Sequence, residues 1–137
     1  MFNDFWATFS QQLTPQMWSV VATATYETVY ISFASTLLAV IVGLPVGVWT
    51  FLTGKNEILQ NNRTHFVLNT IINIGRSIPF IILLLILLPV TRFIVGTVLG
   101  ATAAIIPLSI CAMPFVARLT ANALMEIPNG LTEAAQA

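Results

Sequence analysis

The chain has 137 residues, of which 57% are hydrophobic and 7% are charged, and its formal net charge is zero. Soluble domains carry roughly a quarter of their residues as charged side chains. The five acidic and five basic residues of this chain cannot cover a water-facing surface, so lipid is the solvent that fits. The balanced charge and the lack of adjacent Lys or Arg residues exclude a nucleic-acid-binding surface. Cys111 is the single cysteine, which excludes an internal disulfide and a multi-cysteine metal site.

The N-terminal segment, residues 1–14, predicts a short helix that lies along the membrane interface. Its apolar residues recur at helical spacing opposite polar ones, and they are Phe5, Trp6, Phe9 and Leu13. Asp4 stands where a signal peptide needs a positive charge, so no cleaved leader is expected. Thr14 followed by Pro15 is typical of a helix start, so a new helix should begin there.

Two long uncharged stretches predict membrane-spanning helices. Residues 28–54 and residues 93–117 contain no charged side chain. A helix needs only about 20 residues to cross a hydrocarbon core of about 30 Å. Both stretches are therefore long enough to span a bilayer.

A third span is predicted over residues 66–89, and it contains one charge. Arg76 lies about a third of the way along this span, where a cation is costly unless it reaches the interface or faces protein. A buried functional arginine and an arginine that reaches toward the cytoplasmic interface both fit the sequence. Arg76 is therefore a possible functional residue within the membrane.

The positions of the basic residues predict the orientation of the spans. Lys55 and Arg63 lie in the loop between the first two spans, and Arg118 follows the last span, whereas Arg92 falls on the opposite side. Because basic residues favour the cytoplasmic side, this loop and residues 118–137 are expected in the cytoplasm. His65 lies in the same polar stretch and is interpreted as a solvated loop residue.

Glycine and proline mark places where the spans pack or bend. Gly43 and Gly47 have the spacing that lets helix backbones approach closely, and Gly96, Gly100 and Ala104 repeat small residues at the same interval. Packing within one subunit is favoured over a dedicated dimer face. Four prolines lie within or beside the spans and predict kinks, namely Pro45, Pro79, Pro107 and Pro114.

No catalytic, metal or cofactor site is evident in the sequence. The single histidine, the single cysteine and the scattered carboxylates supply neither a nucleophile with its base nor a metal cage. There is also no Gly-rich loop of the kind that binds nucleotide phosphates. The chain is therefore not expected to be an enzyme, and any energy source must come from another chain.

The C-terminal segment predicts a short helix outside the lipid. The run from Ile127 to Gly130 breaks the preceding helix, and Thr132 is a possible cap for a new one. This helix could pack on the spans of its own subunit or bind a partner protein.

The stretch from Glu126 to Ala135 resembles the Glu-Ala-Ala loop of bacterial binding-protein-dependent ABC importer permeases. Three further stretches, taken in order, are similar to those of the methionine importers in this family; they are Gly43 to Val48, Asn73 to Leu83 and Pro114 to Arg118. The resemblance covers nearly the whole chain from about Glu27 onward.

The resemblance implies an all-α integral membrane protein of the bacterial inner membrane, with about three transmembrane helices and the start of a cytoplasmic coupling helix. It implies a permease that binds a separate ATP-binding subunit, an extracytoplasmic substrate-binding protein and a second permease copy, within membrane lipid. The coupling signature carries over to Glu133, Ala134 and Ala135, with Pro128, Gly130 and Leu131 shaping its entry. The family's loop continues beyond Ala137 to a glycine and further spans, so the chain is expected to be a partial transmembrane domain. The alternative is a non-transporting membrane anchor or assembly protein that presents a cytoplasmic docking helix.

Overall fold

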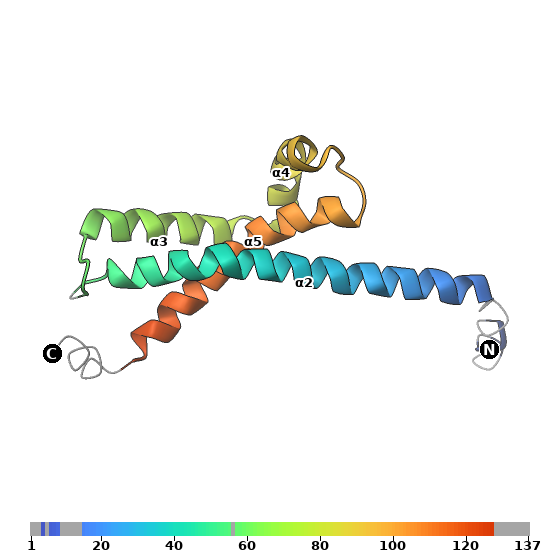
Figure 1. Cartoon of the computed structure of the whole chain (residues 1–137), viewed down its shortest axis with the longest axis horizontal. Coiled ribbons are helices and arrows are strands. Elements are labelled where there is room, and N and C mark those ends of the chain that lie inside the picture. The colour runs from blue at the N-terminus through green and yellow to red at the C-terminus, as the bar shows by residue number, and fades with distance from the viewer. Residues whose placement is uncertain (1–3, 5, 9–14, 56, 128–137) are drawn as a thin grey trace.

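The protein consists of helices in the part of the chain that the computed structural model describes, namely residues 4, 6–8, 15–55 and 57–127 (Figure 1). The elements are α2 (Pro15–Leu52), α3 (Asn62–Ser77), α4 (Phe80–Val95) and α5 (Ala101–Met125). α2 and α5 are each long and apolar enough to cross a membrane, and α3 with α4 forms a third, bent candidate. The all-α membrane fold is thereby confirmed. The predicted N-terminal helix over residues 1–14 and the cap at Thr14 lie largely outside the described residues.

Helix α2 begins at Pro15, as the sequence predicts, and is longer than the expected span of residues 28–54. Its 38 residues extend about 57 Å at the rise of an α-helix. Every residue from 15 to 30 is exposed, and this half of the helix projects beyond the other helices in Figure 1. The core therefore forms only against the C-terminal half of α2.

The main helix contact joins α2 to α5 and is built from small residues. The buried residues of α2 recur about once per turn, and they are Ser35, Ala39, Gly43, Gly47 and Thr50. A Cβ atom added to Gly43 would lie 2.8 Å from the Met113 carbonyl oxygen, and one added to Gly47 would lie 2.5 Å from that of Ala117. The two backbones touch, as small residues permit in membrane helices. The predicted packing of Gly43 and Gly47 within one subunit is confirmed.

Gly96 and Gly100 differ from the sequence interpretation, because they do not lie in a helix-packing row. Gly96 ends α4 with a φ of 83° and donates its N–H to the Arg92 carbonyl. Gly100 precedes α5 with a φ of 100°, and no atom lies within 4 Å of a Cβ added to either residue. Glycine adopts these left-handed conformations without steric cost. The last helix is therefore shifted from the expected 93–117 to Ala101–Met125, and Arg118 lies inside it.

The expected continuous span over residues 66–89 is two helices in the structure. α3 and α4 are bent by 106° at the break between them. Pro79 has no N–H to continue the helix and disfavours helical geometry at the residue before it. Ile78 accordingly adopts an extended conformation with φ of −77° and ψ of 125°. α4 lies across the end of α3 and packs against α5 (Figure 1).

The turn between α2 and α3 brings the two helices side by side. The Leu59 N–H donates to the Leu52 carbonyl, and the Asn61 N–H donates to the Thr53 carbonyl. Asn61 then caps α3, because its side-chain oxygen accepts from the N–H groups of Arg63 and Thr64 at 3.1 and 3.2 Å. α3 therefore starts at Asn62, earlier than the sequence suggested, and runs back along α2.

Candidate functional site

A chain of polar groups joins α2, α3 and α5 near the turn that connects α2 to α3. His65 Nδ1 lies 2.9 Å from the Thr50 carbonyl oxygen, and His65 Nε2 lies 2.8 Å from Asn69 Nδ2. Arg118 Nη1 donates to Asn69 Oδ1 at 3.0 Å. One side chain from α5 is thus tied through two side chains of α3 to the backbone of α2.

The partners fix the direction of every hydrogen bond in this chain. A carbonyl oxygen only accepts, so His65 Nδ1 carries the hydrogen and donates to Thr50. His65 Nε2 then accepts from the Asn69 amide, whose oxygen faces the Arg118 guanidinium. Each of the three contacts thus joins one donor to one acceptor, and the four groups form a continuous network.

The interpretation of His65 as a solvated loop residue is corrected by this geometry. The cap at Asn61 places His65 in the first turns of α3, where it is half-buried against the end of α2. Sequence reasoning also missed Asn69 as a site residue. The available signal was its spacing, since Asn69 follows His65 by four residues and so shares its helix face.

Arg76 lies in the last turn of α3 and faces α5. It lines a cavity of about 100 Å³ together with Phe115, Arg118, Leu119 and Asn122 of α5. The close approach is possible because Gly75 precedes it; a Cβ there would lie 2.7 Å from Pro114 Cγ. The structure therefore places the two arginines beside one cavity. A functional role of Arg76 stays a prediction.

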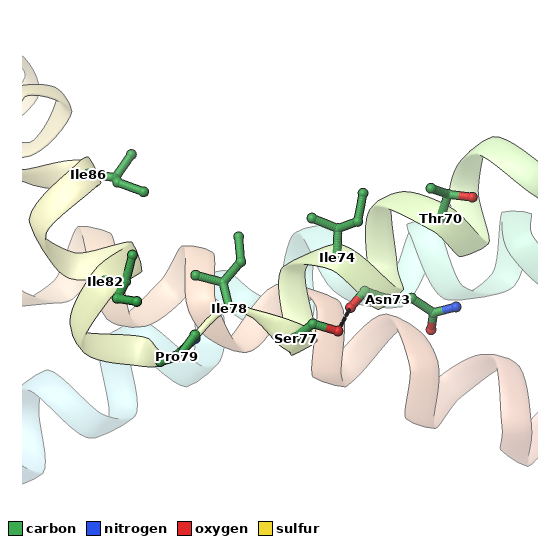
Figure 2. Close-up of a pocket in the computed structure, with 8 residues that line it drawn as sticks. All are labelled: Thr70, Asn73, Ile74, Ser77, Ile78, Pro79, Ile82 and Ile86. Atoms are coloured by element: carbon green, nitrogen blue, oxygen red, sulfur yellow. Dashed lines mark hydrogen bonds between the residues drawn. The ribbon is translucent and has the colours of Figure 1, made fainter.

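A larger hollow of about 610 Å³ lies along the bend between α3 and α4 (Figure 2). Ile74, Ile78 and Ile82 line it with other apolar residues, and Thr70, Asn73 and Ser77 supply its polar atoms. Ser77 donates to the Asn73 carbonyl at 2.7 Å, and Thr70 donates to the Phe66 carbonyl at 2.7 Å. Since no titratable side chain among the described residues lines this hollow, it offers shape rather than acid or base chemistry.

The predicted coupling residues lie outside the described residues; they are Pro128, Gly130, Leu131, Glu133, Ala134 and Ala135. α5 ends at Met125, close to the helix break predicted at Ile127, and the Ile127 N–H donates to the Leu124 carbonyl. The end of α5 lies on the same side of the molecule as the turn between α2 and α3 (Figure 1). Both segments were predicted to share the cytoplasmic side.

Within the described part of the chain, no three His, Cys, Asp or Glu side chains are grouped as a metal site would require. Cys111 is half-buried and free. The features that bring polar side chains of different helices together are the network at His65 and Asn69 and the cavity with the two arginines.

Comparison with known proteins assigns the family. The model for the binding-protein-dependent transport system inner membrane component matches residues 43–137. A probable D-methionine transport system permease protein of Haemophilus influenzae is 96% identical over 121 residues, which cover 88% of this chain and 57% of that protein. The D-methionine transport system permease protein of Escherichia coli K12 is 47% identical over 123 residues, which cover 90% of this chain and 56% of that protein.

A solved structure of the MetNI methionine ABC transporter in an inward-facing conformation has the same fold. It matches with a TM-score of 0.89 and 44% identity, over 90% of this chain and 57% of the matched chain. The curated relatives are transport permeases rather than enzymes, which agrees with the sequence expectation, and the matched family lies in the inner membrane. Because the family model matches most of the chain, the protein belongs to the inner-membrane components of binding-protein-dependent transport systems.

Proposed function

We propose that this chain is the front part of a permease subunit that forms the translocation pathway of an ATP-driven methionine importer. The observation that carries the proposal is the 96% identity to a probable D-methionine transport system permease. At this identity, the fold and nearly all side chains of the matched region are shared. The chain spans 57% of that relative's length, so the proposed activity belongs to the complete subunit.

Three protein partners follow from this proposal. The sequence has no phosphate-binding loop, so an ATP-binding subunit supplies the energy. A second permease copy completes the pathway as a homodimer, and an extracytoplasmic binding protein delivers the substrate. The similarity to a methionine ABC transporter structure supports the pairing with an ATPase.

Residues 128–137 supply the contact with the ATP-binding subunit in this proposal. Ala134 and Ala135 are small enough to let a helix sit closely in a cleft, and Glu133 favours the positive end of the helix dipole. α5 ends at Met125, so a displacement of the coupling segment reaches α5 directly. The bond between Arg118 and Asn69 then passes that displacement to α3.

A substitution in the coupling segment tests the proposal. Ala135→Trp should weaken the association of the ATP-binding subunit with the complete permease by roughly 5- to 150-fold, because overpacking a close contact costs about 1–3 kcal/mol. ATP-dependent methionine uptake in proteoliposomes should fall with it. Ala123→Trp, which adds the same bulk at an exposed position of α5, is the matched control.

Two results would argue against the proposal. Wild-type association and uptake in the Ala135→Trp permease would mean that this segment is not the coupling element. A wild-type complex that binds the ATPase but imports no methionine would instead favour the alternative of a membrane anchor or assembly protein.

A further inference from the structure

Two guanidinium groups share the small cavity between the end of α3 and the middle of α5. Arg76 and Arg118 line its roughly 100 Å³ together with the amide-bearing Asn122. Like charges that face one cavity repel each other, and the repulsion grows where low-dielectric surroundings replace water. Charged side chains within membrane helices pair with one another or with backbone carbonyls, because an unpaired charge in lipid is costly. Such an arrangement is stable when an anion lies between the two cations.

The described residues do not supply that anion. No carboxylate side chain among them lines the cavity. Glu27 borders a separate hollow on α2, and Glu126 lies eight residues beyond Arg118, about 12 Å along the axis of a helix. Neither arginine forms an ion pair within the described part of the chain. An anion that offsets the repulsion would therefore belong to another molecule or segment.

The two arginines are held differently, and both keep donors for a ligand. Arg118 donates one N–H to Asn69 Oδ1 at 3.0 Å, and this bond fixes its position. Its other N–H groups stay free for a ligand, since a guanidinium carries five. Arg76 is exposed and makes no hydrogen bond among the described residues. A planar guanidinium matches the geometry of a carboxylate or phosphate group.

We propose that this cavity binds a single oxyanion, a carboxylate or a phosphate group, between Arg76 and Arg118, with Asn122 as a third donor. A cavity of about 100 Å³ admits such a head group but not a whole amphiphile. The rest of the ligand extends over Phe115 and Leu119, which are 59% and 61% exposed and apolar. The ligand is thus an anionic head group with an apolar tail.

Two sources supply this chemistry, and the experiment separates them. One source is the phosphate of an anionic phospholipid, since basic pockets between membrane helices bind such head groups. The other is the carboxylate of an apolar amino acid during transport, and only this source rests on the proposed function.

The test uses the complete permease with its ATP-binding subunit in nanodiscs. In the lipid arm, native mass spectrometry counts the phosphatidylglycerol molecules retained against a phosphatidylcholine background. In the amino-acid arm, binding of radiolabelled methionine is measured with and without 3-(methylthio)propylamine, which lacks the carboxylate. Arg76→Gln should lower retention or affinity in one arm by about tenfold, the usual effect of a lost charge-assisted hydrogen bond.

Matched variants separate binding from folding. Arg76→Lys keeps the charge and should restore part of the loss, whereas Arg92→Gln removes an exposed arginine of α4 and should change neither arm. The proposal would be overturned if Arg76→Gln and Arg118→Gln both retained phosphatidylglycerol and bound methionine as the wild type does. It would also be overturned if the wild-type protein bound neither ligand. If the wild type imports no methionine, the proposed function fails and the lipid arm still decides this inference.

Discussion

Replacing Asn69 by leucine should loosen the junction of α3 and α5 at a single point. The Asn69 side chain makes two hydrogen bonds, one of 2.8 Å with His65 and one of 3.0 Å with Arg118. Leucine has a similar size but can neither donate nor accept. The substitution therefore removes both bonds and leaves the half-buried guanidinium of Arg118 without this acceptor.

The expected loss can be worked out from these two bonds. A side-chain hydrogen bond in a membrane protein contributes about 0.6 kcal/mol on average, and one to a charged group contributes about 1.5–3 kcal/mol. The bond to His65 belongs to the first kind and the bond to Arg118 to the second. Their sum is about 2–3.5 kcal/mol, which corresponds to a roughly 30- to 400-fold change in the unfolding equilibrium.

Unfolding of the complete permease by SDS in mixed micelles measures this loss. Asn73→Leu is the control, because Asn73 lies one turn further along α3, is exposed and makes no side-chain hydrogen bond within the described residues. A double-mutant cycle with Arg118→Gln should give a coupling energy above about 0.5 kcal/mol, the limit expected of independent sites. Equal losses for Asn69→Leu and Asn73→Leu, with no coupling to Arg118, would refute the network.

Three further changes probe other features of the structure. Gly47→Leu should destabilise the permease by more than about 1–3 kcal/mol, because its Cβ would lie 2.5 Å from the Ala117 carbonyl oxygen and 2.7 Å from Thr120 Cβ. Thr36→Leu on the exposed face of α2 should change stability by under about 0.5 kcal/mol, and equal effects of the two substitutions would contradict the packing. Pro79→Ala restores an N–H at the break and should reduce the 106° bend, so unchanged spin-label distances between α3 and α4 would show that tertiary contacts set the angle instead. A cysteine at position 60, in a cysteine-free background, should react only with reagents that enter the cytoplasm. Labelling by a membrane-impermeant reagent in intact cells would show that the predicted orientation is wrong.

The membrane fold could be predicted from the sequence because lipid imposes a simple rule. Runs without charge, such as residues 28–54, must be helical in a bilayer, where every backbone group needs an internal partner. Pro15 marked the start of α2 for a local reason, since its fixed φ and missing N–H suit only the first turn of a helix. The close approach at Gly43 and Gly47 likewise followed from the absence of side chains there.

Local patterns were ambiguous where two conformations fit the same residues. Pro79 could have kinked a continuous span or ended one helix and started another, and the structure has the break. Gly96 and Gly100 have the interval of a packing row, but they adopt positive φ, and Gly96 ends α4 whereas Gly100 precedes α5. Glycine and proline limit the backbone geometry, and contacts with the rest of the chain select among the conformations that remain.

The candidate sites depended on tertiary structure. The sequence placed Arg76 within one predicted span and Arg118, 42 residues later, just after another, and gave no reason to connect them. They share a cavity because the turn after α2 directs α3 back along the bundle and α5 crosses at Gly75 and Pro114. His65 likewise became a helix-linking residue through the distant Thr50 carbonyl. The sequence by itself determined that the chain lies in lipid, that it is helical and where most spans lie, since these features depend on local composition. Which polar groups from separate helices meet depends on how the backbone turns between the helices, and only the tertiary structure decided it.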